Sequence, residues 1–223
     1  MLKIAVDGPA GAGKSTVAKE IARRMGINYM DTGATYRAMA YALLQMGVKI
    51  EEHDRVVPLL DKIDIAVAYT DQGQRVLWNG KDVTPFIRTP EVSKGASDVA
   101  VIPEVRLKLV EIQRKAAEQY DIIMDGRDIG TYVLPDAQAK FFITAAPRIR
   151  AQRRWLELKE AGVEKDLDEL EREIVARDKT DSEREFAPLR QAEDALLVDT
   201  GDMTADQVAA LLEKKIREVA HVL

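Results

Sequence analysis

The sequence predicts an α/β fold built around a parallel central sheet. Short apolar segments alternate along the chain with amphipathic segments of helical period, and this alternation is typical of strands joined by crossover helices. The predicted strands are apolar throughout rather than at every second residue, as expected when helices cover both faces of a sheet. A length of 223 residues suffices for one well-buried core that carries small insertions.

The first half of the chain shows two strand and helix pairs and then a change of character. Glycine follows each of the two helical segments and ends it. The predicted elements are a strand at 2–6, a helix at 14–25 ended by Gly26, a strand ending at Asp31, a helix ended by Gly47, and a small β insertion between 63 and 84 with strands at 64–70 and 74–80.

The second half returns to the alternation of helices and strands. Pro103 interrupts one long helical segment, and the residues AGVEKD interrupt another, which is heavily charged. The predicted elements are helices within 90–119, a strand at 120–128, a strand at 139–146, helices within 147–180 broken at 161–166, a strand at 195–201, and an amphipathic helix at 205–220 opened by Thr204.

Composition and charge argue against several classes of function. The 33 basic and 38 acidic residues give a net charge of −5, which disfavours a protein that binds nucleic acid through a basic surface. The absence of cysteine excludes disulfides, thiolate metal sites and a cysteine nucleophile, and it fits a reducing cytoplasm. The two histidines, His53 and His221, lie in an acidic stretch and near the C-terminus, unsuited to a triad or a zinc site. We find no signal peptide or membrane-spanning segment and expect a cytoplasmic protein.

The sequence GPAGAGKS at residues 8–15 matches the phosphate-binding pattern G-x-x-x-x-G-K-[ST] at every fixed position. It follows a predicted strand and opens a predicted helix, as the motif requires. Its glycines let backbone N–H groups surround an oxyanion, and the helix N-terminus adds partial positive charge. The expected triphosphate-binding residues are Gly8, Pro9, Ala10, Gly11, Ala12, Gly13, Lys14, Ser15 and Thr16, with Lys14 on the outer phosphates and a hydroxyl of Ser15 or Thr16 on Mg²⁺.

The phosphate-binding motif alone does not say what happens to the triphosphate. The patterns D-x-x-G and N-K-x-D, which a regulatory GTPase carries, do not occur in this sequence. Motor and transporter ATPases are normally larger. These observations favour a small kinase.

Further motifs extend the interpretation to the whole chain. They are DGPAGAGKST, DTGATYR, IRTPEVSKGASDVA, DGRDIGTYVLPDA, ARDKTDSER and LLVDT. With these motifs the sequence resembles the bacterial cytidylate kinases, a branch of the nucleoside monophosphate kinases. The resemblance implies a three-layer P-loop kinase fold in a single domain, residues 1–223, with a small β monophosphate-binding insert at about 62–91 and a short helical lid at about 156–168.

The resemblance also implies the reaction, which is phosphorylation of CMP and dCMP by ATP with Mg²⁺. By resemblance, Arg37 and Arg127 hold the acceptor phosphate, although taken alone each could form a surface ion pair. Asp125 ends an apolar strand, as a carboxylate near Mg²⁺ should, and a capping role explains it equally well. The expected catalytic residues are Lys14, Asp125, Arg127 and Arg184, and the expected metal ligand is Ser15.

Arg177, Asp181 and Arg184 recur at spacings of four and three, which places them on one face of a helix. A solvated face with ion pairs is the usual explanation for this pattern. In the family this face contacts the acceptor, so the resemblance assigns Arg177 and Asp181 to the sugar and Arg184 to the phosphate. Arg153 is a candidate for the donor nucleotide.

The resemblance assigns the base of the acceptor to three residues. Asp128 and Ser97 face the amino group of cytosine, and Arg106 faces N3 and O2; alone, Ser97 reads as a surface hydroxyl and Arg106 as a single charge. The family often has serine where this chain has Thr32. The expected CMP-binding residues are Thr32, Tyr36, Arg37, Ser97, Arg106, Arg127, Asp128, Arg177, Asp181 and Arg184.

This reaction needs no histidine, because the phosphate of a nucleoside monophosphate is largely a dianion at pH 7 and can attack without a general base. Two alternatives stay open, which are another P-loop small-molecule kinase, such as a shikimate-type enzyme, and a nucleotide-binding regulator. The expected partners are the small-molecule substrates CMP and dCMP. We expect no nucleic acid, no membrane and a monomer.

Overall fold

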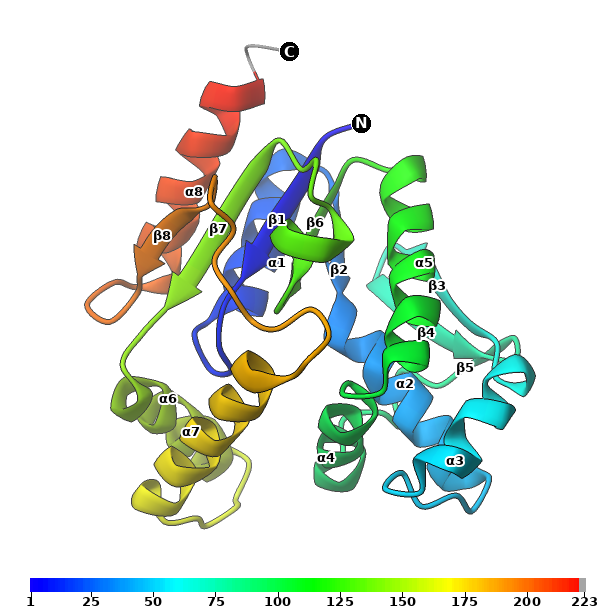
Figure 1. Ribbon diagram of the computed structural model, residues 1–223. Coiled ribbons are helices and arrows are strands. Elements are labelled where there is room, and N and C mark those ends of the chain that lie inside the picture. Colours follow the sequence, from blue (N-terminus) through cyan, green and yellow to red (C-terminus); the bar gives the residue numbers. More distant parts are fainter. Residues whose placement is uncertain (221–223) are drawn as a thin grey trace. The chain divides into compact units, whose positions relative to one another are not determined.

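The structure is a computed structural model that describes residues 1–220 (Figure 1). His221, one of the two histidines considered above, lies outside the described residues. The chain forms two compact units. Unit 1 consists of Met1 and Ile27–Ile122, and unit 2 consists of Leu2–Gly26 and Ile123–Leu223.

The central sheet has five strands in the order β2-β6-β1-β7-β8, and β7 runs parallel to both β1 and β8. The expected α/β fold with a parallel central sheet is therefore confirmed. Its strands are β1 (Lys3–Asp7), β2 (Asn28–Asp31), β6 (Ile122–Gly126), β7 (Ala139–Thr144) and β8 (Leu196–Asp199).

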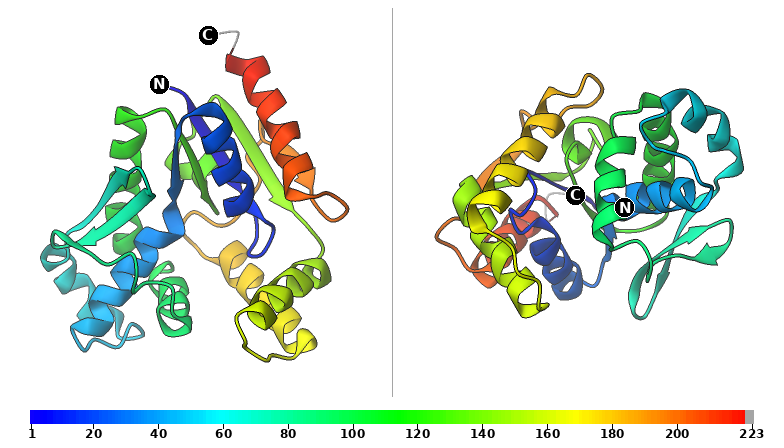
Figure 2. Two further views of the ribbon diagram at one scale, coloured as in Figure 1. Left: turned by 180° about the vertical axis from the view of Figure 1, so that it is seen from behind. Right: turned by 90° about the horizontal axis from the view of Figure 1, so that it is seen from below.

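Helices cover the sheet strands of unit 2. The view from behind shows α1 (Lys14–Met25) and α8 (Ala205–Ala220) side by side against β1 and β7 (Figure 2). The side chains of Ile4, Ala5 and Val6 in β1 are completely buried, as the continuous apolar run predicts. Gly26 ends α1 in the left-handed conformation and its N–H donates to the carbonyl of Ala22.

The outermost strand, β8, departs from the prediction that every strand is covered on both faces. Leu196 and Leu197 are exposed, and Val198 is the buried residue of the strand. As an edge strand, β8 has a neighbour, β7, on one side only. The apolar sequence of β8 therefore predicted a strand covered on both faces, whereas β8 lies at the edge of the sheet.

Two helices of unit 2 follow β7. They are α6 (Pro147–Glu160) and α7 (Leu167–Glu183), which pack together around Ala151, Leu170 and Ile174. The carboxylate of Asp166 caps α7 by accepting the N–H of Glu169 at 2.8 Å. The break between the helices at 161–166 agrees with the sequence, whereas the role of this region as a lid stays a prediction.

Unit 1 combines helices with a small antiparallel sheet. Its core packs α2 against α4 and β4, with buried residues such as Met39, Leu43 and Val92. The strands β3 and β4 pair in the predicted insertion, while the role of this insertion in binding stays a prediction. The elements are α2 (Thr32–Gln45), α3 (His53–Val56), η1 (Val57–Lys62), β3 (Ile65–Thr70), β4 (Gly73–Trp78), β5 (Lys81–Asp82), α4 (Pro90–Val99) and α5 (Pro103–Gln119).

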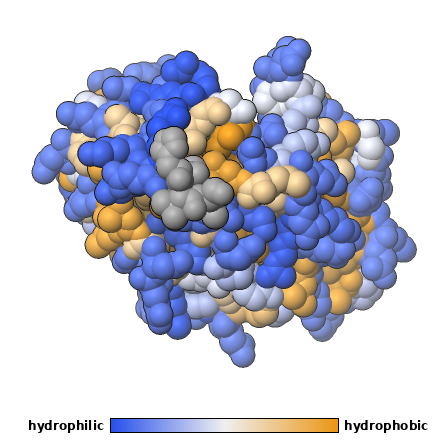
Figure 3. Space-filling view, turned by 90° about the horizontal axis from the view of Figure 1, so that it is seen from above, coloured by the Kyte–Doolittle hydropathy of each residue, from blue (hydrophilic) through white to orange (hydrophobic). Residues whose placement is uncertain are grey.

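The surface seen from above is mostly hydrophilic, with hydrophobic residues in separate groups (Figure 3). Within residues 1–220, none of the helices is both long and apolar enough to cross a bilayer.

The first glycine of the phosphate loop generates a prediction about stability. Gly8 has φ +143°, and an added Cβ would lie 1.9 Å from the carbonyl oxygen of Ile143 in β7. We expect Gly8→Ala to lower the free energy of unfolding by about 2–4 kcal/mol, from backbone strain and overpacking together. Urea unfolding measures it. Gly26→Ala is the control, because Gly26 has φ +67° but no atom near the new Cβ, and it should lose only about 1–2 kcal/mol. Equal losses of unfolding free energy in Gly8→Ala and Gly26→Ala would contradict the predicted clash of the new Cβ with Ile143.

Candidate active site

The phosphate loop, residues 8–15, connects the end of β1 to the start of α1 in unit 2. Gly8, Gly11 and Gly13 all have positive φ, and Gly13 stands at the N-cap of α1. The N-terminal N–H groups of an α-helix lack partners within that helix and favour an anion. The ammonium of Lys14 is buried and donates to the carbonyl oxygen of Pro9 at 2.7 Å. The loop therefore has the geometry of an anion-binding loop.

The charge of Lys14 is disfavoured by its surroundings. Burial and the neighbouring charge of Arg127 lower its pKa to about 7, against the opposing effects of Asp125, Asp7 and Asp181. An anion bound in the loop would add negative charge near Lys14 and favour the protonated form. Burial is the main cause of the lowered pKa, so bound negative charge would stabilise the protonated ammonium of Lys14.

Ser15 of the loop and Asp125 of β6 bring together two oxygen groups that could hold a metal ion. The hydroxyl of Ser15 donates to Oδ2 of Asp125, in β6, at 2.8 Å. Mg²⁺ in phosphate-binding sites typically takes one or two protein oxygens and completes its shell with water and phosphate. These residues fit that requirement, and within residues 1–220 no group of three or more acidic or histidine ligands is assembled for a metal.

The turn after β6 and the C-terminal end of α7 bring together two buried carboxylates and two half-buried arginines. Nε of Arg127 donates to Oδ2 of Asp181 at 2.7 Å, and Arg184 lies 3.4 Å from Oδ1 of Asp128 and 4.0 Å from Oδ1 of Asp181. Burial raises the pKa of Asp181, but the charge and hydrogen bond of Arg127 outweigh it and hold the pKa below its ordinary value. Asp181 therefore stays ionised beside two guanidinium groups.

Arg184 stands at the C-cap of α7, the helix that carries Arg177 and Asp181. Helix α7 ends at Glu183, and Arg184 has an extended ψ of 141°. Its Nε donates to the carbonyl of Ala187 at 2.7 Å, within a turn that precedes Pro188. The guanidinium still reaches Asp181 and Asp128 from this turn, while Arg177 is exposed on α7. The N–H of Arg184 still donates to the carbonyl of Thr180 at 3.2 Å, so the spacing of three places Arg184 beside Asp181, as the sequence suggested.

Asp7, the last residue of β1, binds the backbone of the turn that follows β6. Its two carboxylate oxygens accept the N–H groups of Ile129 and Gly130, each at 2.7 Å, at the start of η2 (Ile129–Val133), a short π-helix. Burial raises the pKa of Asp7 to about 7, despite these two hydrogen bonds. The residue before the phosphate loop thus orders the segment that follows Arg127 and Asp128.

A second group of polar side chains lies within unit 1, at the start of α2. Oδ2 of Asp31 lies 2.6 Å from Arg37 and 3.2 Å from Arg88, while Oδ1 caps α2 by accepting the N–H of Ala34. Gln74 of β4 makes reciprocal hydrogen bonds with the backbone of Asp31, at 2.7 and 3.2 Å. Nε of Arg37 is buried with no hydrogen-bond partner among the described residues. One carboxylate therefore orders two arginines.

The remaining predicted acceptor residues of unit 1 are close to this group in the sequence or lie on α4 and α5. Arg106 is buried on α5 with its guanidinium 5.4 Å from the ring centre of Tyr36 on α2. Thr32 is buried and its carbonyl accepts the hydroxyl of Thr35 at 2.7 Å. Ser97 is half-buried on α4. A cation over an aromatic face is a stabilising contact, so Tyr36 supports Arg106.

The candidate for the donor nucleotide, Arg153, contacts the segment after β8. Its two terminal nitrogens donate to Oγ1 of Thr200 at 3.0 Å and to the carbonyl oxygen of Thr200 at 2.5 Å. The hydroxyl of Thr200 also lies 3.3 Å from the carbonyl oxygen of Ala12 in the phosphate loop. Arg153 is therefore connected to the loop through one threonine.

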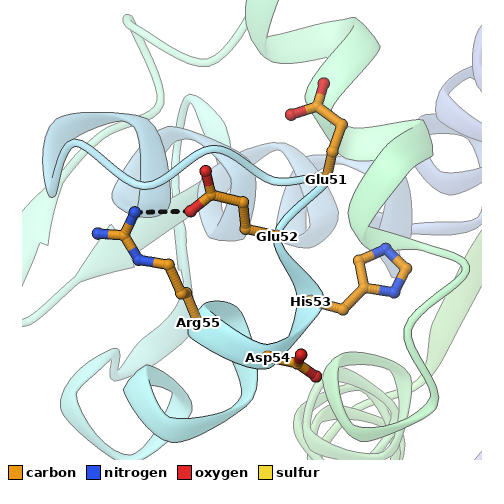
Figure 4. Close-up of a pocket in the computed structure, with 5 residues that line it drawn as sticks. All are labelled: Glu51, Glu52, His53, Asp54 and Arg55. Atoms are coloured by element: carbon orange, nitrogen blue, oxygen red, sulfur yellow. Dashed lines mark hydrogen bonds and ion pairs between the residues drawn. The ribbon is translucent and has the colours of Figure 1, made fainter.

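One surface pocket of unit 1 is lined by Glu51, Glu52, His53, Asp54 and Arg55 (Figure 4). Arg55 pairs with Glu52 at 2.6 Å, and His53 opens the short helix α3. The five residues are consecutive in the chain, so they lie close together because of their sequence positions rather than because the fold assembles them.

Residues 4–218 match the family model described as cytidylate kinase. The chain belongs to the cytidylate kinase family. Curated relatives include the cytidylate kinase of Caldicellulosiruptor saccharolyticus, which is 51% identical over 207 residues, 93% of this chain and 92% of that protein. The cytidylate kinase of Carboxydothermus hydrogenoformans is 46% identical over 222 residues and covers all of both chains.

Solved structures of low sequence identity share the fold of this cytidylate kinase family member. A gluconokinase from Sinorhizobium meliloti 1021 has a TM-score of 0.51 at 12% identity, covering 99% of this chain and 95% of its own. An uncharacterized protein from Eubacterium ventriosum ATCC 27560 has a TM-score of 0.52 at 15% identity, covering 97% and 99%. These likenesses concern the fold alone.

Sequence reasoning about this family member missed Asp7, Asp31, Gln74 and Arg88 as residues that order the site. Asp7 and Asp31 stand in the recognised motifs DGPAGAGKST and DTGATYR, so a signal was available for both. Gln74 and Arg88 are separated from Asp31 by 43 and 57 residues, and no local pattern joins them.

The buried carboxylate of Asp7 generates a prediction about pH. Its folded pKa, about 7, lies above the ordinary 3.8, so the folded state binds a proton more tightly than the unfolded state. Asp7 should therefore cost stability progressively as pH rises from about 4 to about 7. Asp7→Asn does not titrate, so the free energy of unfolding of the wild type minus that of the variant should fall over this range by a few kcal/mol, on the order of 1.4 per pKa unit. Urea unfolding at pH 5 and pH 8 measures this difference, and a difference that is independent of pH contradicts the shift.

Proposed function

We propose that this protein transfers the γ-phosphoryl group of ATP to CMP and dCMP. The observation that supports this proposal is the family match over residues 4–218, in a chain whose phosphate loop contains a buried lysine. The named relatives in this family are cytidylate kinases at 46–51% identity. The protein is in this proposal a phosphotransferase that acts on small nucleotides as a monomer in the cytoplasm.

In this proposal the donor is ATP, bound by residues 8–16. The backbone N–H groups of the glycine loop and the N-terminus of α1 face its phosphates, and Lys14 leaves the carbonyl of Pro9 to reach the outer ones. Arg153 contacts the donor nucleotide from α6. Ser15 and Asp125 would hold Mg²⁺, which neutralises charge on the phosphates when bound.

The acceptor phosphate is proposed to bind to arginines. Arg37 offers a buried Nε that lacks a hydrogen-bond partner among the described residues, and Asp31 holds its guanidinium in place. Arg127 is held in the same way by Asp181, and Arg184 by Asp128 and Asp181. Guanidinium groups bind phosphate oxygens through charge-assisted, often bidentate, hydrogen bonds. Preordered arginines therefore suit both the bound phosphate and the transferred group.

The rest of the acceptor is proposed to contact the other predicted residues. Arg177 and Asp181 contact the sugar, while Asp128, Ser97 and Arg106 read the cytosine edge, with Thr32 and Tyr36 beside them. Catalysis then consists of positioning and charge stabilisation by Lys14, Arg127 and Arg184, since the acceptor dianion attacks in line without a general base. This account uses no histidine.

The test of this function is an ATP-consumption assay with CMP, dCMP, UMP, AMP, shikimate or no acceptor. We expect rapid turnover with CMP and dCMP, and little with shikimate or without acceptor. Lys14→Ala serves as the inactive control, because loss of one preorganised charge costs roughly 3 kcal/mol or more in the transition state. Turnover that favours shikimate, or that needs no acceptor, would replace this function with one of the alternatives.

Arg127→Ala is expected to impair use of the acceptor rather than binding of ATP. It removes charge-assisted bonds to the monophosphate, so kcat/KM for CMP should fall by about a hundredfold or more. Steady-state kinetics measures the fall, and calorimetry measures the affinity for ATP, which should change by less than about threefold. A variant that loses ATP affinity instead would move Arg127 to the donor side.

The proposed recognition of cytosine by Asp128 and Arg106 predicts a strong preference for CMP over UMP. Uracil would set its O4 against the carboxylate of Asp128 and its N3–H against Arg106, at a cost of roughly 1–3 kcal/mol for each unpaired polar group. The expected discrimination in kcat/KM is on the order of a hundredfold. In Asp128→Ala the ratio should collapse, mainly through loss of CMP turnover. Measurement of kcat/KM for CMP and UMP with the wild type and with Asp128→Ala tests this prediction. An unchanged ratio of the two values would contradict the proposed recognition of the base by Asp128.

A further inference from the structure

The side chain of Arg150 on α6 joins three segments of unit 2 and has no part in the function proposed above. Its Nε donates to the carbonyl of Ala145 at 2.8 Å, and its Nη1 donates to the carbonyl of Ala10, in the phosphate loop, at 2.9 Å. Its Nη2 lies 2.7 Å from Oδ2 of Asp178 on α7. Arg150 is only 3% exposed, so these partners take the place of water around its guanidinium.

A second observation shows that the loop backbone packs directly on Arg150. A Cβ added to Gly11 would lie 3.2 Å from Cβ of Arg150 and 3.5 Å from its carbonyl oxygen. Ala10 and Gly11 are consecutive residues of the loop, and both contact Arg150. The close approach of Gly11 and the hydrogen bond from Arg150 to Ala10 together fix the middle of the loop against α6.

Asp178 extends this connection toward the acceptor arginine. Its Oδ2 pairs with Arg150, while its Oδ1 is buried without a hydrogen-bond partner among the described residues. Burial lowers the pKa of Arg127, and the charges of Asp181, Asp125 and Asp178 outweigh it and raise the pKa. Asp178 therefore acts electrostatically on Arg127 while it binds Arg150.

We propose that Arg150 and Asp178 are positioning residues that hold the phosphate loop and α7 in one fixed arrangement. The pair contacts no substrate in this proposal. Arg150 keeps the carbonyl of Ala10 directed away from the anion side of the loop, so the N–H groups need no reordering when phosphate binds. Asp178 holds Arg150 in the conformation that makes this contact. The proposal rests on the proposed function only in taking the loop as the binding site of a nucleotide.

Lysine cannot replace Arg150 in this role. A guanidinium presents several donors in a fixed plane and reaches Ala145, Ala10 and Asp178 at once, whereas an ammonium is a single point charge on a flexible chain. Arg150→Lys thus keeps the charge opposite Asp178 and loses the geometry. Asp178→Asn keeps the shape of the partner and loses its charge.

The chain offers a matched control for the pair. Arg148 also joins α6 to α7, through ion pairs with Asp168 and with Glu171, the latter at 2.9 Å. It is half exposed, and its ion pairs among the described residues do not involve the phosphate loop. Arg148→Met should leave nucleotide affinity within about twofold of the wild type, because exposed ion pairs contribute little.

The experiment measures the dissociation constant for ADP by calorimetry, KM for ATP and CMP, and the melting temperature. In Arg150→Lys and in Asp178→Asn we expect the ADP dissociation constant and KM for ATP to rise by about tenfold to a hundredfold, as misplacement of a binding group does. A merely structural role would lower the melting temperature and leave the affinity of the folded protein unchanged. Wild-type affinity in both variants would overturn the proposal.

Asp178→Asn also separates positioning from direct binding. If Arg150 acted only as a ligand of the nucleotide, loss of Asp178 would leave ADP affinity unchanged or improved, and this result too would overturn the proposal. Should a single variant fail to fold, the double variant Arg150→Met with Asp178→Leu decides, since replacing both members of a buried pair with apolar side chains is often neutral for stability. Weakened ADP binding by the folded double variant supports positioning, and wild-type binding refutes it.

ADP binding keeps this test independent of the acceptor. If the wild type binds ADP but phosphorylates no cytidine nucleotide, the proposed function fails while the affinities still decide the role of the pair.

Discussion

Burial of charge is the constraint on which the site in unit 2 depends. A buried ammonium or guanidinium group is tolerated only where carboxylates or carbonyl oxygens stand close to it. Lys14, Arg127 and Arg150 all meet this condition, through Pro9, Asp181 and Asp178 respectively. The positions of the acidic residues thus follow from those of the basic ones. In the proposed function Lys14 exchanges the carbonyl of Pro9 for phosphate, whereas Asp181 holds Arg127 in place in advance, which reduces the reorganisation needed during the reaction.

The order of strands and helices was largely predictable, because each element has a local signal. Gly26 and Pro103 mark a helix end and a helix start, and the apolar segments mark the sheet strands. The elements that escaped prediction lack such signals. Residues 53–62 form short helices in a charged stretch, and residues 129–133 form a π-helix whose shape depends on hydrogen bonds to Asp7, which lies more than 120 residues away in the chain.

The candidate site was predictable where a contiguous motif carries it and not where side chains meet from distant segments. The phosphate loop and the residues around Arg127 stand in recognisable motifs, and the structure gives each a defined geometry. By contrast, Arg150 sits among several arginines on α6, and no pattern distinguishes it from exposed Arg148 or Arg154. Only burial and partners from distant segments distinguish Arg150 from these exposed arginines, and both properties arise only when the chain folds.

The reciprocal contact between Gln74 and Asp31 limits how the small sheet can change over evolutionary time. The turn between β3 and β4 is exposed and polar, and such turns ordinarily tolerate insertions and deletions. Successive residues of a strand point to opposite faces, so a one-residue insertion between the turn and Gln74 would carry the amide to the other face of β4. Asp31 would lose both hydrogen bonds, although no residue near the arginines had changed. The length of this segment is therefore constrained by a contact that its exposed, polar sequence does not reveal.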